Sequence, residues 1–206
     1  MSGRFITLEG GEGAGKSTQA KLLAERLRAA GHAVTLTREP GGTPAGEDVR
    51  ALLVSGDPRR WSAEAEALLN SAARDAHLLQ LIRPSLAEGG IVISDRFMDS
   101  TRAYQGYAGG CDMALIDALE HSIVGATRPD LTLMFDLDPE LGLIRARARG
   151  EGEDRYERKG LGFHRLLRQG FLEIARDEPQ RCRIIDASAD RDSVTAAVWA
   201  AVEPVL

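Results

Sequence analysis

A nine-residue glycine-rich segment near the N-terminus constrains the fold of this chain more than any other feature. It reads Gly-Gly-Glu-Gly-Ala-Gly-Lys-Ser-Thr from Gly10 to Thr18 and fits the pattern G-x-x-x-x-G-K-[ST]. The strand-like run Arg4–Glu9 precedes it and the helical run Ser17–Ala30 follows it. A strand that turns through glycines into a helix aims backbone N–H groups and the positive helix end at one anion. The segment therefore predicts a phosphate-binding loop at the edge of an α/β sheet.

The residues of this loop suit the chemistry of phosphate binding. Glycines let backbone N–H groups converge on phosphate oxygens, because they adopt conformations that other residues avoid. Lys16 supplies a compact positive charge to the terminal phosphates, and the hydroxyl of Ser17 can bind Mg²⁺. We expect a nucleoside triphosphate to contact the whole segment, which consists of Gly10, Gly11, Glu12, Gly13, Ala14, Gly15, Lys16, Ser17 and Thr18.

Strand-like and helical runs alternate along the rest of the chain. The strand-like runs, several of them apolar at their centres, are Arg4–Glu9, Ala33–Thr37, Ile91–Asp95, Leu131–Asp136 and Arg183–Asp186. Continuous apolar runs of this length are typical of parallel strands that are covered on both faces. A chain of 206 residues with this alternation predicts one doubly wound α/β domain.

Local signals mark several helix ends and loops. Residues suited to the start of a helix are Ser62, Asp112 and Pro139. Pro84 is expected to kink or end the helix that follows Ser62, and the last helix is expected to start near Asp192. The clusters of glycine and proline at 39–46 and of glycine at 150–162 predict loops.

Composition excludes several classes of protein. The formal net charge of −5 argues against general binding to nucleic acid. The longest apolar run, Ala196–Val202, is far shorter than the roughly 20 residues of a membrane span. Cys111 and Cys182 are isolated, so they predict neither a disulfide framework nor a metal cluster. We therefore expect a reducing, cytoplasmic compartment.

Among nucleotide-binding classes, the sequence favours a small phosphotransferase. A GTPase needs an Asn-Lys-x-Asp segment to read its base, but the single asparagine, Asn70, is followed by Ser71. Motor ATPases usually need a longer chain. Asp95 and Arg96 end the third strand, at the edge of the sheet where ligands bind. Asp95 can hold Mg²⁺ through water, and Arg96 can form a bidentate contact with a phosphate.

Further short segments follow the phosphate loop in a fixed order. They are Arg38-Glu39-Pro40-Gly41-Gly42-Thr43, Asp95-Arg96-Phe97, Asp99-Ser100-Thr101 with Ala103-Tyr104-Gln105-Gly106, Arg128-Pro129-Asp130-Leu131-Thr132, and Asp154-Arg155-Tyr156-Glu157. Together with the loop, this ordered set resembles the bacterial thymidylate kinase family from residue 5 to about residue 186.

The resemblance implies an ATP-dependent transferase that phosphorylates dTMP to dTDP in nucleotide biosynthesis, by in-line transfer under an arginine-bearing lid. It implies the P-loop nucleoside-monophosphate kinase fold, an α/β fold whose five parallel strands have the order 2-3-1-4-5 between flanking helices. It also implies one domain over residues 1–206 with a lid at about 149–160, and adenine near 186–188. ATP, Mg²⁺ and dTMP are the expected ligands, and a cytoplasmic homodimer without nucleic acid or membrane partners is the expected state.

Roles in the acceptor site follow from the resemblance residue by residue. Glu12 is expected near the sugar 3′-hydroxyl, Arg74 at the thymine edge, and Tyr104 where it would exclude a 2′-hydroxyl. A cis peptide bond between Glu39 and Pro40 is a further hypothesis. The expected substrate-binding set is Glu12, Arg38, Glu39, Pro40, Asn70, Arg74, Arg96, Ser100, Thr101, Tyr104 and Gln105, and the expected metal ligands are Ser17 and Asp95.

One position departs from the family pattern. Four residues before Arg74 the family usually has a phenylalanine that stacks on thymine, and here the residue is Asn70. Base–aromatic stacking contributes about 1–3 kcal/mol, so its loss should weaken dTMP binding. Phe97 or Tyr104 could replace the ring, or Asn70 could hydrogen-bond the base. This departure keeps a dUMP or UMP kinase open as an alternative.

The family places an arginine on the transferred phosphoryl group either from the phosphate loop or from the lid. The loop of this chain has no arginine, so the lid must supply it, and the best candidates are Arg149 and Arg155, with Arg145 next. The expected catalytic set is therefore Lys16, Arg96, Arg149 and Arg155. The histidines, which have no acidic partner at motif spacing, are expected at the surface: His32, His77, His121 and His164.

Two further expectations concern turnover and charge. A nucleotide-binding regulatory module without turnover is the alternative from a different class, and Lys16, Asp95 and Arg96 argue against it. The 26 basic residues include only three lysines, and arginine occupies the positions suited to phosphate forks. We therefore expect a strongly positive cavity inside a molecule with a negative outer surface.

Overall fold

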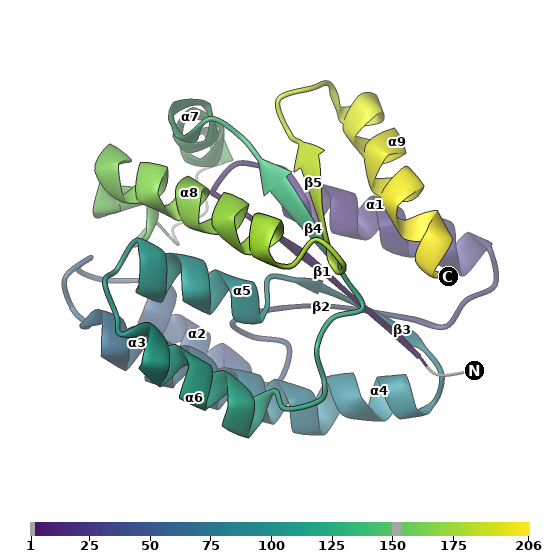
Figure 1. Ribbon diagram of the computed structural model, residues 1–206, viewed down its shortest axis with the longest axis horizontal. Helices are drawn as coiled ribbons and strands as arrows, with labels where there is room; N and C mark the ends of the chain where they lie inside the picture. Colours follow the sequence, from purple (N-terminus) through teal and green to yellow (C-terminus); the bar gives the residue numbers. More distant parts are fainter. Residues whose placement is uncertain (1–2, 150–153) are drawn as a thin grey trace.

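The sheet at the centre of the molecule has the expected strand order. The computed structural model describes residues 3–149, without the side chain of Arg149, and residues 154–206. In this described part, one sheet of parallel strands has the order β2-β3-β1-β4-β5 (Figure 1). Its strands are β1 (Arg4–Gly10), β2 (Val34–Arg38), β3 (Ile91–Asp95), β4 (Leu131–Asp136) and β5 (Cys182–Asp186). The predicted fold is confirmed, and the strand ends agree with the sequence pattern to within one residue.

Parallel pairing brings the carboxyl ends of the strands to one edge of the sheet. Central strand β1 pairs with β3, where Leu8 lies opposite Asp95, and with β4, where Gly10 lies opposite Phe135. The phosphate loop that follows β1 therefore lies beside the residues that end β3. This edge is where ligands bind in open α/β sheets.

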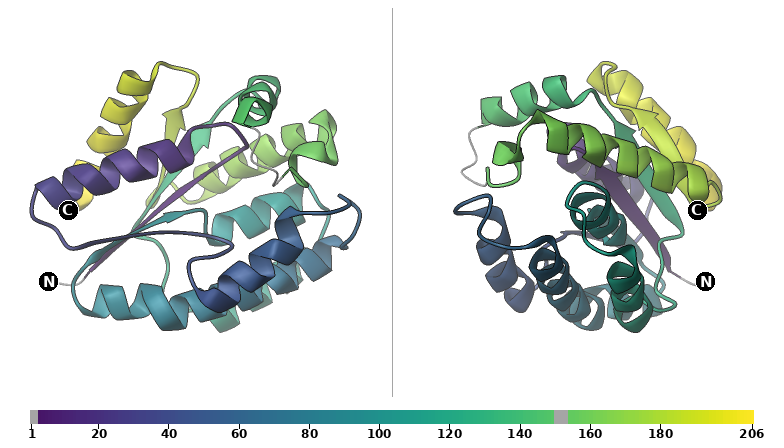
Figure 2. Two further views of the ribbon diagram at one scale, coloured as in Figure 1. Left: turned by 180° about the vertical axis from the view of Figure 1, so that it is seen from behind. Right: turned by 60° about the vertical axis from the view of Figure 1, so that its left-hand side comes forward.

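Helices cover both faces of the sheet. The α-helices are α1 (Lys16–Ala29), α2 (Pro44–Val54), α3 (Ala63–His77), α4 (Arg83–Ala87), α5 (Met98–Thr101), α6 (Met113–Ile123), α7 (Pro139–Arg149), α8 (Leu161–Asp177) and α9 (Arg191–Val202). The π-helical segments are η1 (Leu78–Ile82) and η2 (Arg102–Tyr107), and the 3₁₀ segments are η3 (Glu157–Lys159) and η4 (Glu203–Val205). Helices α1 and α9 lie side by side on one face, and α4, α5 and α8 lie on the other (Figures 1 and 2). None of the described helices is both long and apolar enough to cross a membrane.

Alternate residues of β1 face different apolar cores. Ile6 and Leu8 are buried in the core that α1 and α9 cover. Phe5 points to the opposite face, where its ring centroid lies 4.9 Å from that of Phe97. Because side chains alternate along a strand, Glu9 lies on the same face as Phe5. Strand β1 thus carries the carboxyl group of Glu9 into the buried layer beneath α5.

The signals for helix starts are confirmed. The hydroxyl of Ser62 accepts a hydrogen bond from the Ala65 N–H at 3.2 Å, at the start of α3. The carboxylate of Asp112 accepts from the Ala114 N–H at 2.9 Å, at the start of α6. Pro139 is the first residue of α7. Each residue satisfies or removes a backbone N–H that a helix leaves unpaired at its start.

The helical content exceeds the expectation in two places. The helix after Ser62 continues through Pro84, because the π-helical turn η1 precedes it and shifts the hydrogen-bond register around a residue without an N–H donor. The segments predicted as loops at 39–46 and 150–162 give way to helix earlier than expected. Helix α2 begins at Pro44, where Thr43 caps it, and α8 begins at Leu161.

Candidate active site

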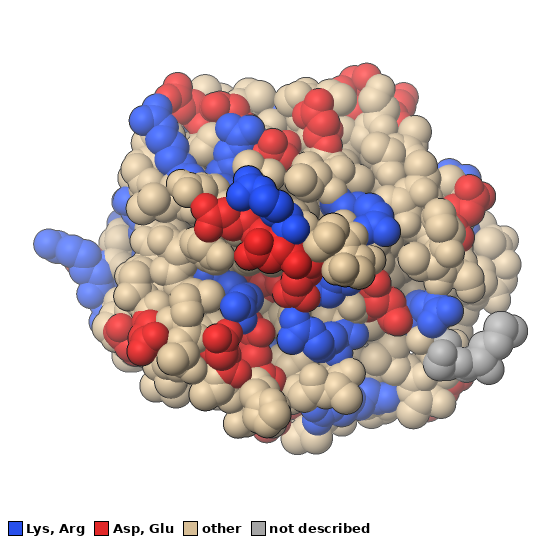
Figure 3. Space-filling view, in the orientation of Figure 1, with Lys and Arg blue, Asp and Glu red and all other residues tan. Residues whose placement is uncertain are grey.

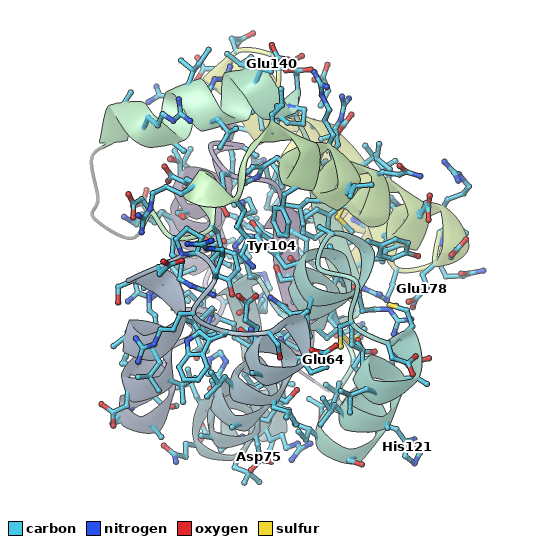
Figure 4. The ribbon with its side chains drawn as sticks, turned by 90° about the vertical axis from the view of Figure 1, so that its left-hand side faces the viewer. Glu64, Asp75, Tyr104, His121, Glu140 and Glu178 are labelled. Carbon is cyan, nitrogen blue, oxygen red and sulfur yellow. The ribbon has the colours of Figure 1, made fainter. Side chains whose placement is uncertain are left out.

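A cavity of about 960 Å³ opens where the strands end. Tyr104 lies among its walls, in the middle of the molecule (Figure 4). The expected site residues that line it are Glu12, Gly13, Ala14, Gly15, Lys16, Ser17, Arg38, Glu39, Pro40, Asn70, Asp95, Arg96, Ser100, Thr101, Tyr104 and Gln105. The described members of the expected set that do not line it are Gly10, Gly11, Thr18, Arg74 and Arg155. Residues spread over most of the sequence therefore meet in one place.

The phosphate loop has the backbone geometry that its glycines predict. Gly13 and Gly15 have φ angles of 68° and 84°, in the left-handed region that glycine favours. A Cβ on Gly13 would lie 2.1 Å from the carbonyl oxygen of Gly142, so α7 packs directly on the loop. Lys16 begins α1, and its Nζ donates to the Gly11 carbonyl at 2.7 Å. The loop thus encloses a helix N-terminus and a cation.

Ser17 and Asp95 meet at the mouth of the loop. The Ser17 hydroxyl donates to Oδ2 of Asp95, across the gap between α1 and the end of β3. Among the described residues, no group of three or more His, Cys, Asp or Glu side chains could hold a metal ion alone. The pair could supply two of the hard oxygen ligands that Mg²⁺ prefers, and substrate phosphates commonly supply others.

Arg96 connects the phosphate loop to the acceptor side of the cavity. Its φ of 72° is the only positive value among the non-glycine residues that the structure describes, and such strain clusters at functional sites. Its Nη1 donates to the Gly10 carbonyl at 2.9 Å, and its Nη2 donates to Glu12 at 3.2 Å. The guanidinium carbon lies 4.9 Å from the ring centroid of Tyr104, whose hydroxyl also donates to Glu12.

These charges shift the pKa values of their neighbours. Burial alone would raise the pKa of Glu12, but the charges of Arg96 and Lys16 outweigh it and lower the pKa to about 2. Burial and the positive charge of Arg96 lower the pKa of Lys16 to about 8. Burial raises the pKa of the Tyr104 hydroxyl. Glu12 is therefore a fixed anion against which Arg96 and Tyr104 are oriented.

The peptide bond between Glu39 and Pro40 is cis, as hypothesised from the sequence. A buried ionic cluster lies beneath this peptide. Glu39 accepts from Arg74 Nε at 2.8 Å, and its other oxygen lies 2.9 Å from Nδ1 of His77. Arg74 also donates through Nη2 to Thr101 at 3.1 Å. Arg74 is thus held rigidly next to the cavity, where it does not form part of the wall.

Two expectations about histidines are wrong. His77 is fully buried between Glu39 and Thr37, whose hydroxyl lies 2.7 Å from its Nε2. His164 is buried in α8, and its Nε2 lies 3.1 Å from the Tyr156 carbonyl oxygen. The partners of His77 come from β2 and the segment after it, far along the chain, and the partner of His164 lies in the segment before α8, so spacing on one helix could not reveal them.

The structure narrows what can replace the missing aromatic ring at the base. Phe97 is fully buried against Phe5, and the guanidinium of Arg74 lies 5.1 Å from its ring centroid, so it supports Arg74 rather than the cavity. Tyr104 does line the cavity. Asn70 lines it too, and its Nδ2 donates to the carbonyl of Glu66 at 2.8 Å.

The candidate lid arginines differ in position. Arg155 is fully buried, and its guanidinium donates to Glu66 at 2.6 Å and to the carbonyls of residues 53, 57 and 58. It therefore fastens its segment to the end of α2 and the start of α3, which is not the position expected for a phosphoryl contact. Arg145 donates to the Ala187 carbonyl at 3.1 Å. The side chain of Arg149, like residues 150–153 of the expected lid, lies outside the described part. Arg147 lines the cavity.

Sequence reasoning missed several residues of the site. Glu66 receives Arg155, and Gly142 contacts the phosphate loop. Glu9 accepts from the Phe97 N–H at 2.7 Å and from the Ser100 hydroxyl at 2.6 Å. Burial, followed by the charge of Asp99, raises the pKa of Glu9 to about 8. A carboxylate placed inside an apolar strand or helix pattern was the available signal for Glu9 and Glu66.

The strand order, the phosphate loop after β1 and the adjoining cavity define a P-loop nucleoside-monophosphate kinase. The family model for thymidylate kinase matches residues 8–198. The thymidylate kinase of Caulobacter vibrioides is 59% identical over 95% of this chain and 94% of its own length, and that of Ruegeria pomeroyi is 54% identical over 96% and 93%. A crystal structure of thymidylate kinase from Ehrlichia chaffeensis matches with a TM-score of 0.80 and 37% identity, over 98% of this chain and 99% of that one.

The chain belongs to the thymidylate kinase family. It is a phosphotransferase that converts dTMP to dTDP. This activity decides against the two alternatives that the sequence left open, a UMP or dUMP kinase and a nucleotide-binding module without turnover.

Proposed function

We propose that the phosphoryl donor is ATP with Mg²⁺ and that the phosphoryl group passes directly to the phosphate of dTMP. The position of Arg96 carries this proposal, because its guanidinium lies between the phosphate loop and the acceptor side of the cavity. The second pKa of a phosphate monoester is about 6, so the acceptor oxygen is largely unprotonated at pH 7 and needs no general base. The task of the protein is to neutralise and align two polyanions.

The donor side consists of the phosphate loop and the Ser17–Asp95 pair. Backbone N–H groups of the loop and the ammonium of Lys16 would bind the phosphates of ATP, and a bound phosphate would replace the Gly11 carbonyl as the partner of Lys16. Ser17 and Asp95 would hold Mg²⁺. When bound, Mg²⁺ supplies positive charge that offsets the charge developing on the transferred group.

The acceptor side consists of residues from α3 and from the segment after β3. Glu12, held by Arg96 and Tyr104, would face the sugar, and the ring of Tyr104 would limit the space beside it. Gln105, which lines the cavity, would contact the edge of the base. Arg74 would act from behind this wall, where its Nε and Nη2 donate to Glu39, Thr101 and the Phe97 carbonyl and so hold Thr101 beside the base.

The experiment that tests the role of Arg96 replaces its fork with a single ammonium. We expect Arg96→Lys to lower kcat about 10³-fold, because a lysine cannot contact the loop and a phosphate at once. Steady-state kinetics with ATP and dTMP measure this, and circular dichroism checks the fold. A kcat within a few-fold of the parent would contradict the proposal.

Arg147 is the arginine that we propose for the transferred phosphoryl group, because it lines the cavity from α7. We expect Arg147→Ala to lower kcat by about 10³-fold or more. Arg145→Ala is the matched control on the same helix, since Arg145 donates to the Ala187 carbonyl, and it should change kcat only a few-fold. Arg149→Ala is measured alongside. If Arg145→Ala and Arg147→Ala lower kcat to the same extent, the assignment of Arg147 to the transferred phosphoryl group is wrong.

The assembly is proposed to be a homodimer in a reducing compartment. Leu68 and Leu79, on the run formed by α3 and η1, are 51% and 57% exposed, which suits an apolar interface. Both cysteines are buried and unpaired. Sedimentation equilibrium should give twice the chain mass, and Leu68→Glu should shift the equilibrium to the monomer. A monomeric parent protein at micromolar concentration would exclude the dimer.

A further inference from the structure

Glu66 on α3 is a buried carboxylate that the chemistry described above does not use. Its side chain is 1% exposed. Its Oε1 accepts from Arg155 at 2.6 Å and from Lys159 at 3.0 Å. Its Oε2 accepts from Gln105 Nε2 at 2.8 Å, from the Tyr156 hydroxyl at 3.2 Å, and from Lys159 at 3.2 Å. One carboxylate thus connects α3, η2 and the segment around Tyr156.

These contacts fix which way the amide of Gln105 points. A carboxylate that is paired with two cations can only accept hydrogen bonds, so the NH₂ group of Gln105 must face Glu66. The opposite atom, Oε1 of Gln105, is buried and has no hydrogen-bond partner among the described residues. Because Gln105 lines the cavity, this oxygen is an acceptor that awaits a donor from a ligand.

Pyrimidine bases differ in what they offer to such an acceptor. Thymine carries an N–H at position 3, whereas cytosine carries an unprotonated ring nitrogen there and an amino group at position 4. A fixed carbonyl can accept from the thymine imide and faces a lone pair if the base is cytosine. A fixed NH₂ group would have the opposite preference. Buried polar groups left without a partner cost about 1–3 kcal/mol.

We propose that Glu66 is a positioning residue that sets the base preference of the kinase by holding the Gln105 carbonyl toward the imide of the acceptor base. Its Oε1 accepts from Arg155 and Lys159, and its Oε2 makes its shortest hydrogen bond, at 2.8 Å, with Gln105. The proposal rests on the proposed contact between Gln105 and the base. It gives Arg155 and Lys159 an indirect part in base selection, although neither lines the cavity.

The test begins with Glu66→Gln, which keeps the size and shape of the side chain. The carbonyl of the new amide must face Arg155 and Lys159, since both only donate, so its NH₂ group faces Gln105. Gln105 must then turn its own carbonyl toward position 66 and present NH₂ to the base. We expect the KM for dTMP to rise about tenfold or more, with the KM for ATP unchanged, and the preference for dTMP over dCMP in kcat/KM to fall at least as far.

Exchanging the two residues provides the rescue. In Glu66→Gln/Gln105→Glu, the amide at position 66 donates to one oxygen of the carboxylate at position 105, and the other oxygen again faces the base as an acceptor. We expect the preference for dTMP over dCMP to return to within a few-fold of the parent value. This variant keeps one carboxylate near the two cations, so it also serves as the measured variant if Glu66→Gln does not fold.

A third variant distinguishes an error in the role proposed for Glu66 from an error in the proposed contact between Gln105 and the base. Gln105→Met removes both polar atoms at similar length. If Gln105→Met leaves the dTMP/dCMP preference unchanged, the base contact of Gln105 is wrong and the inference falls with it. If Gln105→Met lowers the preference while a folded Glu66→Gln does not, the contact stands and the role of Glu66 is overturned. A folded exchange variant that lacks the dTMP preference overturns it as well, because a merely structural role predicts no rescue.

Discussion

Lysine and arginine make different kinds of contact at this site. Lys16 occupies the phosphate loop, where a compact ammonium can turn from the Gly11 carbonyl to a phosphate. Arg96 uses separate nitrogens for Gly10 and Glu12, which a single ammonium cannot do. The scarcity of lysine in the sequence does not itself identify the site. It does make clear that lysine is used where one compact charge is needed and arginine where two partners are contacted at once.

The position that departs from the family offers a direct test of base binding. We expect Asn70→Phe to lower the KM for dTMP or leave it unchanged, because a ring at this wall of the cavity can stack on the base for about 1–3 kcal/mol. The amide that would be lost donates to the Glu66 carbonyl within the same helix. Steady-state kinetics at saturating ATP measure the change. A large rise in the KM would instead identify Asn70 as a specific ligand of the base.

Glu9 gives the folded chain a pH dependence that can be isolated by mutation. Its pKa rises from 4.5 to about 8 on folding, so the folded state holds a proton that the unfolded state releases above pH 4.5. The stability that this proton supplies is lost as the pH rises toward 8, with a slope of at most about 1.4 kcal/mol per pH unit. Glu9→Gln should remove this loss.

Urea denaturation between pH 5 and pH 8 checks this prediction. The free energy of unfolding of the Glu9→Gln variant, relative to the parent, should increase steadily with pH. Parallel pH profiles for the two proteins would show that Glu9 is ionised in the folded state at neutral pH.

At the scale of elements, the contact between α8 and η2 sets how closely the segment that carries Tyr104 and Gln105 is held. A Cβ on Gly170 would lie 2.6 Å from Cβ of Tyr107, which is too close for a side chain to rotate away. We expect Gly170→Ala to lower the free energy of unfolding by about 1–3 kcal/mol. Gly162→Ala on the same helix meets nothing within 4 Å and should leave stability equal or up to about 1 kcal/mol higher. Equal effects of the two changes in urea denaturation would contradict this packing argument.

The sequence was sufficient for elements whose signal is local and insufficient for contacts made across the chain. The strands and the phosphate loop were predictable because apolar runs and G-x-x-x-x-G-K-[ST] are continuous patterns. The π-helical turns η1 and η2 have no periodicity of their own, and η1 allows the helical run to pass Pro84. The burial of Arg155 depends on carbonyl groups about one hundred residues away, so its charge and its glycine-rich surroundings suggested a mobile arginine instead.

At the scale of the whole molecule, acidic and basic residues are mixed within the cavity and on the surface, and they are not separated into a positive cavity and a negative surface. The described lining of the cavity contains six basic residues (Lys16, Lys21, Arg38, Arg50, Arg96 and Arg147) and six acidic ones (Glu12, Glu39, Glu47, Asp95, Asp154 and Glu157). The formal charge of the described lining is therefore zero and not strongly positive as was expected. It is still less negative than the net charge of the chain, which is −5. Acidic and basic side chains also intermingle on the face in Figure 3. The carboxylates orient cations such as Arg96, and Mg²⁺ would add the missing positive charge.

The most direct test of the account compares acceptors in one assay. Release of ADP from ATP is measured with dTMP, dUMP, UMP, dCMP and AMP in turn, at equal enzyme and Mg²⁺. We expect kcat/KM to be highest for dTMP, lower for dUMP, and lowest for the monophosphates whose sugar or base the cavity rejects. A higher kcat/KM for UMP, dCMP or AMP than for dTMP, or no turnover with any of the five, would contradict it.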